Sequence, residues 1–138
     1  MKLKKVLSTM QMKEIYIQRS AFERNNSKIS GKSLEIEFER GRKQLEDSLF
    51  QVILNTHIHN TANEFSIDLS VVGIFDVSKV DASMCETLLD KNTYAILFPF
   101  VRSQVTLLTS QPGMQPIVLP AININSMIEA SSEIDIEQ

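Results

Sequence analysis

Two histidines, His57 and His59, come nearest to a chemical site in this sequence. They are two positions apart in a run that alternates apolar and polar residues, so both imidazoles lie on one face of a predicted strand. Zinc sites use this spacing but need a third and usually a fourth ligand, and the sequence offers only Cys85 and scattered acids. Because both histidines are on the polar side of the strand, we interpret them as solvated and predict no metal site.

Other catalytic groups are equally poorly supported. Cys85 belongs to an apolar stripe at helical spacing, without a basic neighbour to activate its thiol, so we interpret it as a packing residue. None of the four glycines belongs to a phosphate-binding loop, and no serine stands in a nucleophile elbow. We therefore predict a protein that is not an enzyme and that uses no cofactor.

Length and composition indicate one ordinary globular domain. The chain has 138 residues, of which 43% are hydrophobic and 22% charged. We expect a single domain over 1–138, with a basic N-terminal extension at 1–11 and an acidic flexible tail at 130–138. The apolar stretch after the basic start is short, so we expect no signal peptide and no membrane insertion. A single cysteine excludes an internal disulfide and fits the cytoplasm.

The two parts of the chain carry opposite charge. Residues 1–45 hold eleven of the fourteen lysines and arginines with five acids, whereas 46–138 hold three basic residues and twelve acids. Such a split can mark a basic arm for nucleic acid. No interleaved arginine and aromatic residues of the kind that stack on bases accompany it, so we interpret the charges as solvated faces and expect no nucleic-acid partner.

The first half of the chain predicts strands, because apolar and polar residues alternate with a period of two. Four runs show this pattern, at 13–24, 34–40, 49–60 and 64–77. A polar segment at 41–47 is expected to turn the chain, and residues 61–63 suit a short hairpin. The first run changes parity, which predicts a bulge or bend near Ser20.

The second half changes to helical spacing. Asp81 is a good N-cap for a first helix, and apolar residues at 97, 100, 101, 105 and 108 mark an amphipathic helix. Pro99 fits either the first turn of that helix or a kink within a longer one. The segment 116–120 is framed by two prolines and is expected to run extended over the surface, before a short helix at 125–129.

These elements together predict an α+β fold, a four-stranded antiparallel sheet with helices packed on one face. The other face is then left for water or for another subunit.

Several motifs resemble the SecB-type export chaperones of bacteria. The similarity covers roughly 12–128, and its order and spacing match the Gly-Ile-Phe strand end, the Ile-Leu-Phe-Pro-Tyr-Ala-Arg helix start and the Pro-x-Leu-x-Leu-x-Pro-Val-Asn loop of that family. In this sequence the motifs are Gly73-Ile-Phe75, Ile96-Leu-Phe-Pro-Phe-Val-Arg102, Pro116-Ile-Val-Leu-Pro120 and Ala121-Ile-Asn123, with Ile15-Tyr-Ile-Gln to Phe22-Glu23 similar to the first strand.

The resemblance implies a SecB-like fold and a homotetramer built as a dimer of dimers. It also implies a holdase that binds unfolded polypeptides and delivers precursors to SecA for export through the Sec translocase, without nucleotide or metal. Divergent relatives instead guard the antitoxin of a toxin–antitoxin pair, and a purely structural oligomer without client binding is a further alternative. Little chain is left after Met127 for the long C-terminal helix of the family.

Two sets of candidate residues follow. A client groove needs exposed, adaptable apolar surface, and the candidates for it are Tyr16, Phe38, Phe98, Phe100 and Met127. The acidic sheet face that contacts SecA in the family retains acids at Glu23 and Asp68, whereas Arg19 and Ser66 depart from the family pattern.

Overall fold

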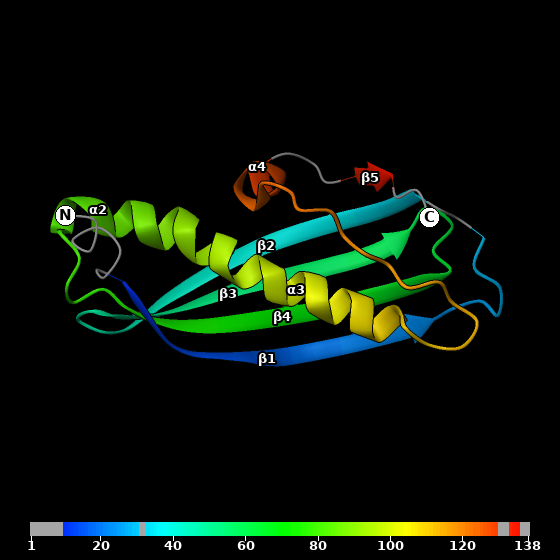
Figure 1. The fold of residues 1–138 in the computed structure, drawn as a ribbon, viewed down its shortest axis with the longest axis horizontal. Helices are drawn as coiled ribbons and strands as arrows, with labels where there is room; N and C mark the ends of the chain where they lie inside the picture. Colours follow the sequence, from blue (N-terminus) through cyan, green and yellow to red (C-terminus); the bar gives the residue numbers. More distant parts are fainter. Residues whose placement is uncertain (1–9, 31–32, 130–132, 136–138) are drawn as a thin grey trace, which may run out of the picture.

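The computed structural model describes residues 10–30, 33–129 and 133–135, and its main element is an antiparallel sheet with a long helix lying across it (Figure 1). The sheet order is β1-β4-β3-β2-β5. The strands are β1 (Gln11–Arg24), β2 (Ser33–Glu46), β3 (Leu49–Asn60), β4 (Phe65–Asp76) and β5 (Glu133–Asp135). The four long strands confirm the predicted antiparallel sheet.

The second strand is longer than the sequence predicts. Residues 41–47 were expected to turn, but β2 continues through Glu46, and Gly41 pairs with Ile53 of β3. The expectation was wrong because these polar residues have a paired strand beside them, and pairing satisfies their backbone groups whatever their side chains are. The chain turns only after Glu46, and Leu49 begins β3.

The first strand contains the predicted irregularity. Its register against β4 shifts between Ile17 and Arg19, close to the expected position at Ser20, and again between Met12 and Glu14. The extra residue in each bulge changes which face the following side chains occupy. This accounts for the change of parity in the sequence.

The helical layer covers one face of the sheet, as predicted. It consists of α2 (Ala82–Thr87), a π-helical turn η1 (Leu88–Asn92), α3 (Thr93–Thr109) and the short α4 (Ile124–Glu129). Asp81 is the N-cap residue of α2, although its side chain makes no capping hydrogen bond. The polar residues before α3 belong to η1, which joins α2 to α3, and Pro99 lies inside α3 rather than in its first turn.

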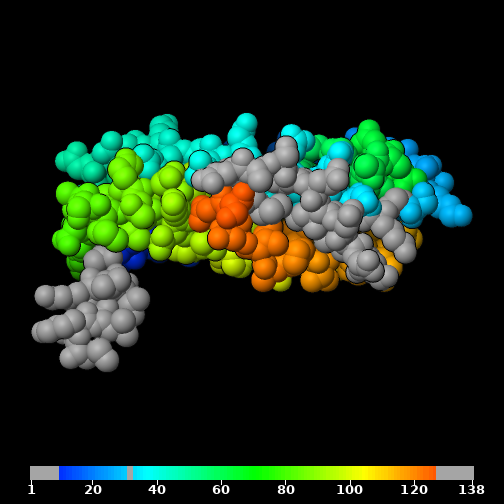
Figure 2. Space-filling model, turned by 90° about the horizontal axis from the view of Figure 1, so that it is seen from above, coloured from blue at the N-terminus to red at the C-terminus, as the bar shows by residue number. Residues whose placement is uncertain are grey.

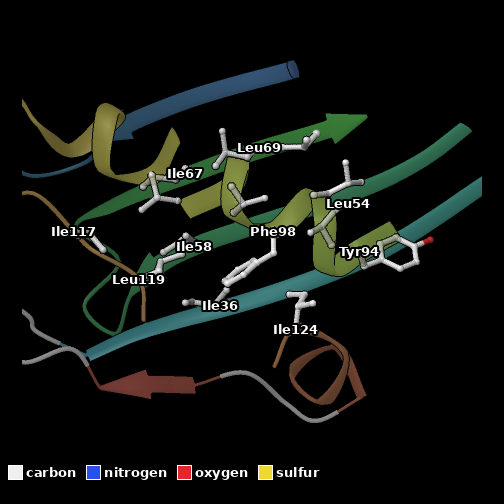
Figure 3. Close-up of a cluster of buried hydrophobic side chains, with 14 of the residues drawn as sticks. Ile36, Leu54, Ile58, Ile67, Leu69, Tyr94, Phe98, Ile117, Leu119 and Ile124 are labelled. Atoms are coloured by element: carbon white, nitrogen blue, oxygen red, sulfur yellow. The ribbon is translucent and has the colours of Figure 1, made fainter. Parts of the chain in front are cut away.

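The core lies between α3 and the inner face of the sheet (Figure 3). Alternate residues of β3 and β4 point toward the helix, and their counterparts point outward. The core includes Ile36, Val52, Leu54, Ile58, Phe65, Ile67, Leu69, Val71, Phe75, Leu97, Val101 and Val105. Burial of this many apolar side chains fixes the position of α3 over the sheet.

The C-terminal segment departs from the prediction of a frayed tail. Glu133–Asp135 forms β5, which pairs with Ser33–Glu35 at the start of β2. The other residues of the predicted tail, and most of the predicted N-terminal extension, lie outside the described residues. Within the described part of the chain, no helix is long and apolar enough to cross a membrane.

Candidate functional site

The segment 116–120 is fixed against α3 by polar contacts. Arg102 Nε donates to the carbonyl of Leu119 at 3.0 Å, and Thr106 Oγ1 donates to the carbonyl of Ile117 at 2.8 Å. The amide of Ile117 donates back to Thr109 Oγ1 at 2.8 Å. Prolines at both ends remove two backbone donors that would otherwise need partners. The segment is extended, as predicted, and its ladder of bonds runs to helix side chains rather than to a strand.

Two adjoining pockets lie in the seam between α3 and the chain from 118 to 125. Figure 2 shows this segment, in orange, beside the yellow-green helix. One pocket has a volume of about 580 Å³ and the other about 510 Å³, and both are lined by Pro99 and Arg102. We call this seam the α3 groove. Its further lining residues are Ala95, Phe98, Ser103, Thr106, Leu107, Ser110, Val118, Leu119 and 121–125.

Exposed aliphatic side chains stand along the α3 groove. Leu107 is 65% exposed and Val118 is 62% exposed, whereas Ile117 and Leu119 on either side of Val118 are buried. Alternation along an extended segment explains this pattern, because successive side chains point to opposite sides. The apolar surface left open to solvent is therefore built into both walls of the groove.

Phe98 and Phe38, two of the predicted client-binding residues, are brought together by the fold. Phe98 is 4% exposed and lies at the wall of the α3 groove, where it packs among core residues such as Ile36 and Ile124 (Figure 3). Its ring meets that of Phe38 edge to face, with centroids 5.9 Å apart. Both rings are largely committed to the core, so they shape the groove more than they offer surface to a ligand.

The other predicted client-binding residues do not join this pair. Phe100 is 40% exposed on α3, and Tyr16 is 39% exposed on β1, where its partner Val72 belongs to the outer face of the sheet. Met127 belongs to α4, but its side chain lies outside the described part of the structure. The four candidates whose side chains the structure describes thus do not form a single surface.

Sequence reasoning missed Leu107 and Val118. Leu107 stands next to the buried stripe of α3 rather than in it, and Val118 is the middle residue of the proline-framed segment. An apolar residue out of phase with its neighbours was the available signal in both cases. Neither carries a polar group that would have drawn attention.

The predicted acidic contact residues lie on the outer face of the sheet. Glu23 of β1 pairs with Ser66 and is exposed, and Asp68 is two residues further along β4 on the same face. Asp68 Oδ1 lies 2.7 Å from His57 Nδ1. The two acids therefore occupy adjacent strands of one surface, on the opposite side of the sheet from the α3 groove.

The α3 groove is suited to binding rather than to bond-making. Its lining includes aliphatic and aromatic side chains, the hydroxyls of Thr106 and Ser110 donate to backbone carbonyls, and Arg102 supplies a positive charge. Such a seam can accept apolar side chains of an extended peptide.

Comparison with known proteins agrees with this architecture. The family model described as "Preprotein translocase subunit SecB" matches residues 4–134. The protein-export protein SecB of Cupriavidus taiwanensis is 23% identical over 135 residues, covering 92% of this chain and 78% of that protein. The SecB of Dechloromonas aromatica is 30% identical over 97 residues, covering 68% of this chain and 64% of that protein.

A solved structure shares the fold at low sequence identity. The SecB-like chaperone of Mycobacterium tuberculosis, in complex with a ChAD peptide from the HigA1 antitoxin, superimposes with a TM-score of 0.70 and 17% identity. The match covers 85% of this chain and 90% of that one. With a family model that spans nearly its whole length and a sheet-and-helix layer of the same form, this chain belongs to the SecB family.

Proposed function

We propose that this protein is a holdase that binds unfolded polypeptides in the α3 groove. The observation that carries the proposal is the apolar seam itself, with Leu107 and Val118 open to solvent on opposite walls. Membership of the SecB family supports the same function. The groove holds a client by burying the client's apolar side chains, so no nucleotide, metal or covalent step is required, and the proposal includes no enzymatic activity.

The strength of binding follows from the area that the groove covers. Each client side chain that is fully buried contributes about 1.5–3 kcal/mol. One such contact is weak, but several along one client add through their high effective concentration. A long unfolded chain is therefore retained, whereas a folded protein that hides its apolar residues is not.

An aggregation assay tests this function. A chemically unfolded substrate is diluted into a solution of the wild-type protein or of the double variant L107S/V118S. Light scattering measures how much of the substrate aggregates in each case. The wild type is expected to suppress aggregation at a few subunits per substrate, and the double variant to need roughly tenfold more because two apolar contacts are lost.

The matched control is L45S, which removes an aliphatic residue that is 41% exposed on β2, outside the α3 groove. L45S is expected to suppress aggregation like the wild type. If L45S and L107S/V118S lose the same amount of aggregation suppression, or if the wild type does not suppress aggregation, the proposal is contradicted. The purely structural alternative then remains. The solution mass of each variant separates loss of the groove from loss of assembly.

We also propose that the protein assembles as a homotetramer, a dimer of dimers. The edge strand β1 supports this, because Met12, Tyr16 and Ile17 are 36–40% exposed along it. Apolar residues on a long edge strand invite pairing with a second copy. A solution mass near four subunits is the expected result.

The downstream partner proposed for the holdase is SecA, with delivery of secretory precursors from the cytoplasm. Glu23 and Asp68 on the outer sheet face are the proposed contacts. Because the face is on the other side of the sheet from the α3 groove, a client and a partner can be bound together. E23Q/D68N is expected to weaken SecA binding without changing suppression of aggregation.

A second candidate function is the guarding of one dedicated partner, such as an antitoxin. The structural similarity to a SecB-like chaperone that was solved with an antitoxin peptide favours it. Two observations would favour this function over general export. One is a toxin–antitoxin pair in the neighbouring genes, and the other is crosslinking of the α3 groove to a single protein.

A further inference from the structure

The strand register gathers charged and metal-binding side chains on the outer face of the sheet, where the sequence showed only scattered acids. Glu37 of β2 pairs with His57 of β3, and Glu35 pairs with His59. On the other side of β3, His57 pairs with Asp68 of β4. Directly paired residues on one face are close neighbours, so both imidazoles have carboxylates beside them.

Hydrogen-bond acceptors lie beside Nδ1 of each histidine. His57 Nδ1 lies 2.7 Å from Asp68 Oδ1, and His59 Nδ1 lies 3.0 Å from the backbone carbonyl of Asn60. A carbonyl oxygen and an ionised carboxylate only accept hydrogen bonds, so Nδ1 of each ring carries the hydrogen. The lone pair of a neutral His57 is then at Nε2, whereas Nε2 of His59 faces Glu35 Oε2 at 3.2 Å, where a bound cation would take the place of a proton. Histidines that bind metals use this arrangement, in which the second nitrogen donates to a carboxylate or carbonyl.

The spacing of the candidate ligand atoms suits a small cation. One ligand atom from each of Glu37, His57 and His59 lies within 4.8 Å of the other two, and the rings of the two histidines have centroids 5.4 Å apart. Ligands of tetrahedral zinc are separated by about 3.3 Å. Glu37 is exposed, so its carboxylate has room to rotate toward the two imidazoles. Glu35 Oε2 already lies 3.2 Å from His59 Nε2.

We propose that His57, His59 and Glu37 form a binding site for a divalent cation that prefers imidazole ligands, with Zn²⁺ as its occupant and Glu35 within reach as the fourth ligand. Asp68 is a positioning residue, because it orients His57 and has no ligand role. A mixed nitrogen and oxygen set of this kind selects zinc-like metals over Mg²⁺ and Ca²⁺, which prefer all-oxygen sites. The cation would neutralise part of the acidic outer face.

Calorimetric titration of the tag-free, full-length protein with ZnCl₂, after treatment with EDTA and dialysis, tests the proposal. One Zn²⁺ per chain is expected, bound in the low micromolar range and unaffected by millimolar Mg²⁺. H57Q and H59Q are each expected to weaken binding at least tenfold, and D68N by about 10- to 100-fold through loss of ring orientation. E37Q is expected to weaken binding to a similar extent.

The matched control is E39Q, which removes the same charge from the same strand face two residues from Glu37 but outside the ligand group. Binding by E39Q and by C85S is expected to equal that of the wild type. The chain has two histidines, so a proton NMR spectrum shows two sets of ring signals, and Zn²⁺ should shift both. Nitrogen NMR of the metal-free protein should show hydrogen at Nδ1 in both rings.

The proposal is overturned if the wild type binds no Zn²⁺, if H57Q and H59Q bind as well as the wild type, or if E39Q loses as much affinity as E37Q. The last result would indicate general attraction to an acidic surface. None of these measurements uses a client or SecA, so their outcome is independent of the proposed holdase function.

Discussion

Gly73 of β4 lies directly beneath Leu97 of α3, so closely that a Cβ atom on Gly73 would be 3.0 Å from Leu97 Cδ2 and 2.7 Å from the Phe75 ring. Both contacts are shorter than normal packing allows. The glycine of the Gly-Ile-Phe motif is therefore required by the approach of the helix to the sheet, and not by backbone conformation.

Replacing Gly73 by alanine is expected to reduce the free energy of unfolding by about 1–3 kcal/mol, because the added methyl group must displace α3 or the Phe75 ring. Urea denaturation followed by circular dichroism measures the change. Gly41 provides the control, since a Cβ there would be 3.7 Å from Ile53 Cβ, an ordinary contact. G41A should be as stable as the wild type, and a G73A variant of unchanged stability would refute the packing argument.

Asn60 and Glu64 join the β3–β4 hairpin to the chain before β2. Asn60 Nδ2 donates to Glu64 Oε1 at 2.9 Å, the Glu64 amide donates to Asn60 Oδ1 at 2.7 Å, and the Ser30 amide donates to Glu64 Oε1 at 2.8 Å. Both side chains are buried. N60A is expected to cost about 1–3 kcal/mol, since it removes two hydrogen bonds between buried groups of Asn60 and Glu64.

Thermal unfolding of N60A measures this loss, and T61A, which removes the exposed hydroxyl of the residue next to Asn60, serves as its comparison. A melting temperature of N60A equal to that of T61A would contradict the structural role of the buried amide.

Phe98 and Phe100 are expected to respond differently to alanine, although the sequence suggested that both bind clients. F98A removes a buried ring and should destabilise the fold by about 3–5 kcal/mol. F100A removes a ring that is 40% exposed and should leave stability within about 0.5 kcal/mol. Guanidinium denaturation of both variants checks this, and only F100A is then suitable for client-binding assays. A similar decrease in the free energy of unfolding in the two variants would show that Phe100 is also part of the packed core.

Because of Tyr94, the free energy of unfolding is expected to depend on pH in the alkaline range. Burial raises the pKa of Tyr94 above its usual value of 10.0, and its hydroxyl donates to the Gly41 carbonyl at 3.1 Å. The unfolded chain therefore loses this proton at lower pH than the folded protein does. The contribution of Tyr94 to stability is constant below about pH 10 and falls as pH rises above that value.

Y94F should be less stable than the wild type by about 1 kcal/mol near pH 8, because the hydrogen bond is lost. The difference should narrow above pH 10, where only the wild type has Tyr94 to ionise. Denaturation series of both proteins between pH 8 and pH 11 measure this, and the other alkaline effects cancel in the comparison. A constant difference across the range would show that Tyr94 titrates normally.

Strands β3 and β4 were predictable because one face of each is buried. Alternation in β3 and β4 reports burial directly, since every second side chain packs under α3. The end of β2 was not predictable in the same way. Its polar residues after Gly41 are exposed on both faces, and they are strand because β3 pairs with them. Pairing depends on the partner strand and leaves no periodic signal in the segment itself.

The candidate site was less predictable than the fold. An aromatic residue in an amphipathic pattern looks the same whether it closes the core, as Phe98 does, or stands outside it, as Phe100 does. The outer face shows the opposite difficulty. Glu37 and His57 are far apart in sequence and become neighbours only through strand register, which composition and spacing do not reveal.

The bonds that join 116–120 to Thr106, Thr109 and Arg102 have a kinetic consequence. They hold the outer wall of the α3 groove in place, so a peptide that binds there as proposed would meet a wall that is already ordered. Little entropy remains to be lost on the protein side of the complex. The association rate should then be similar for different peptides, and differences in their affinity should come mainly from their dissociation rates.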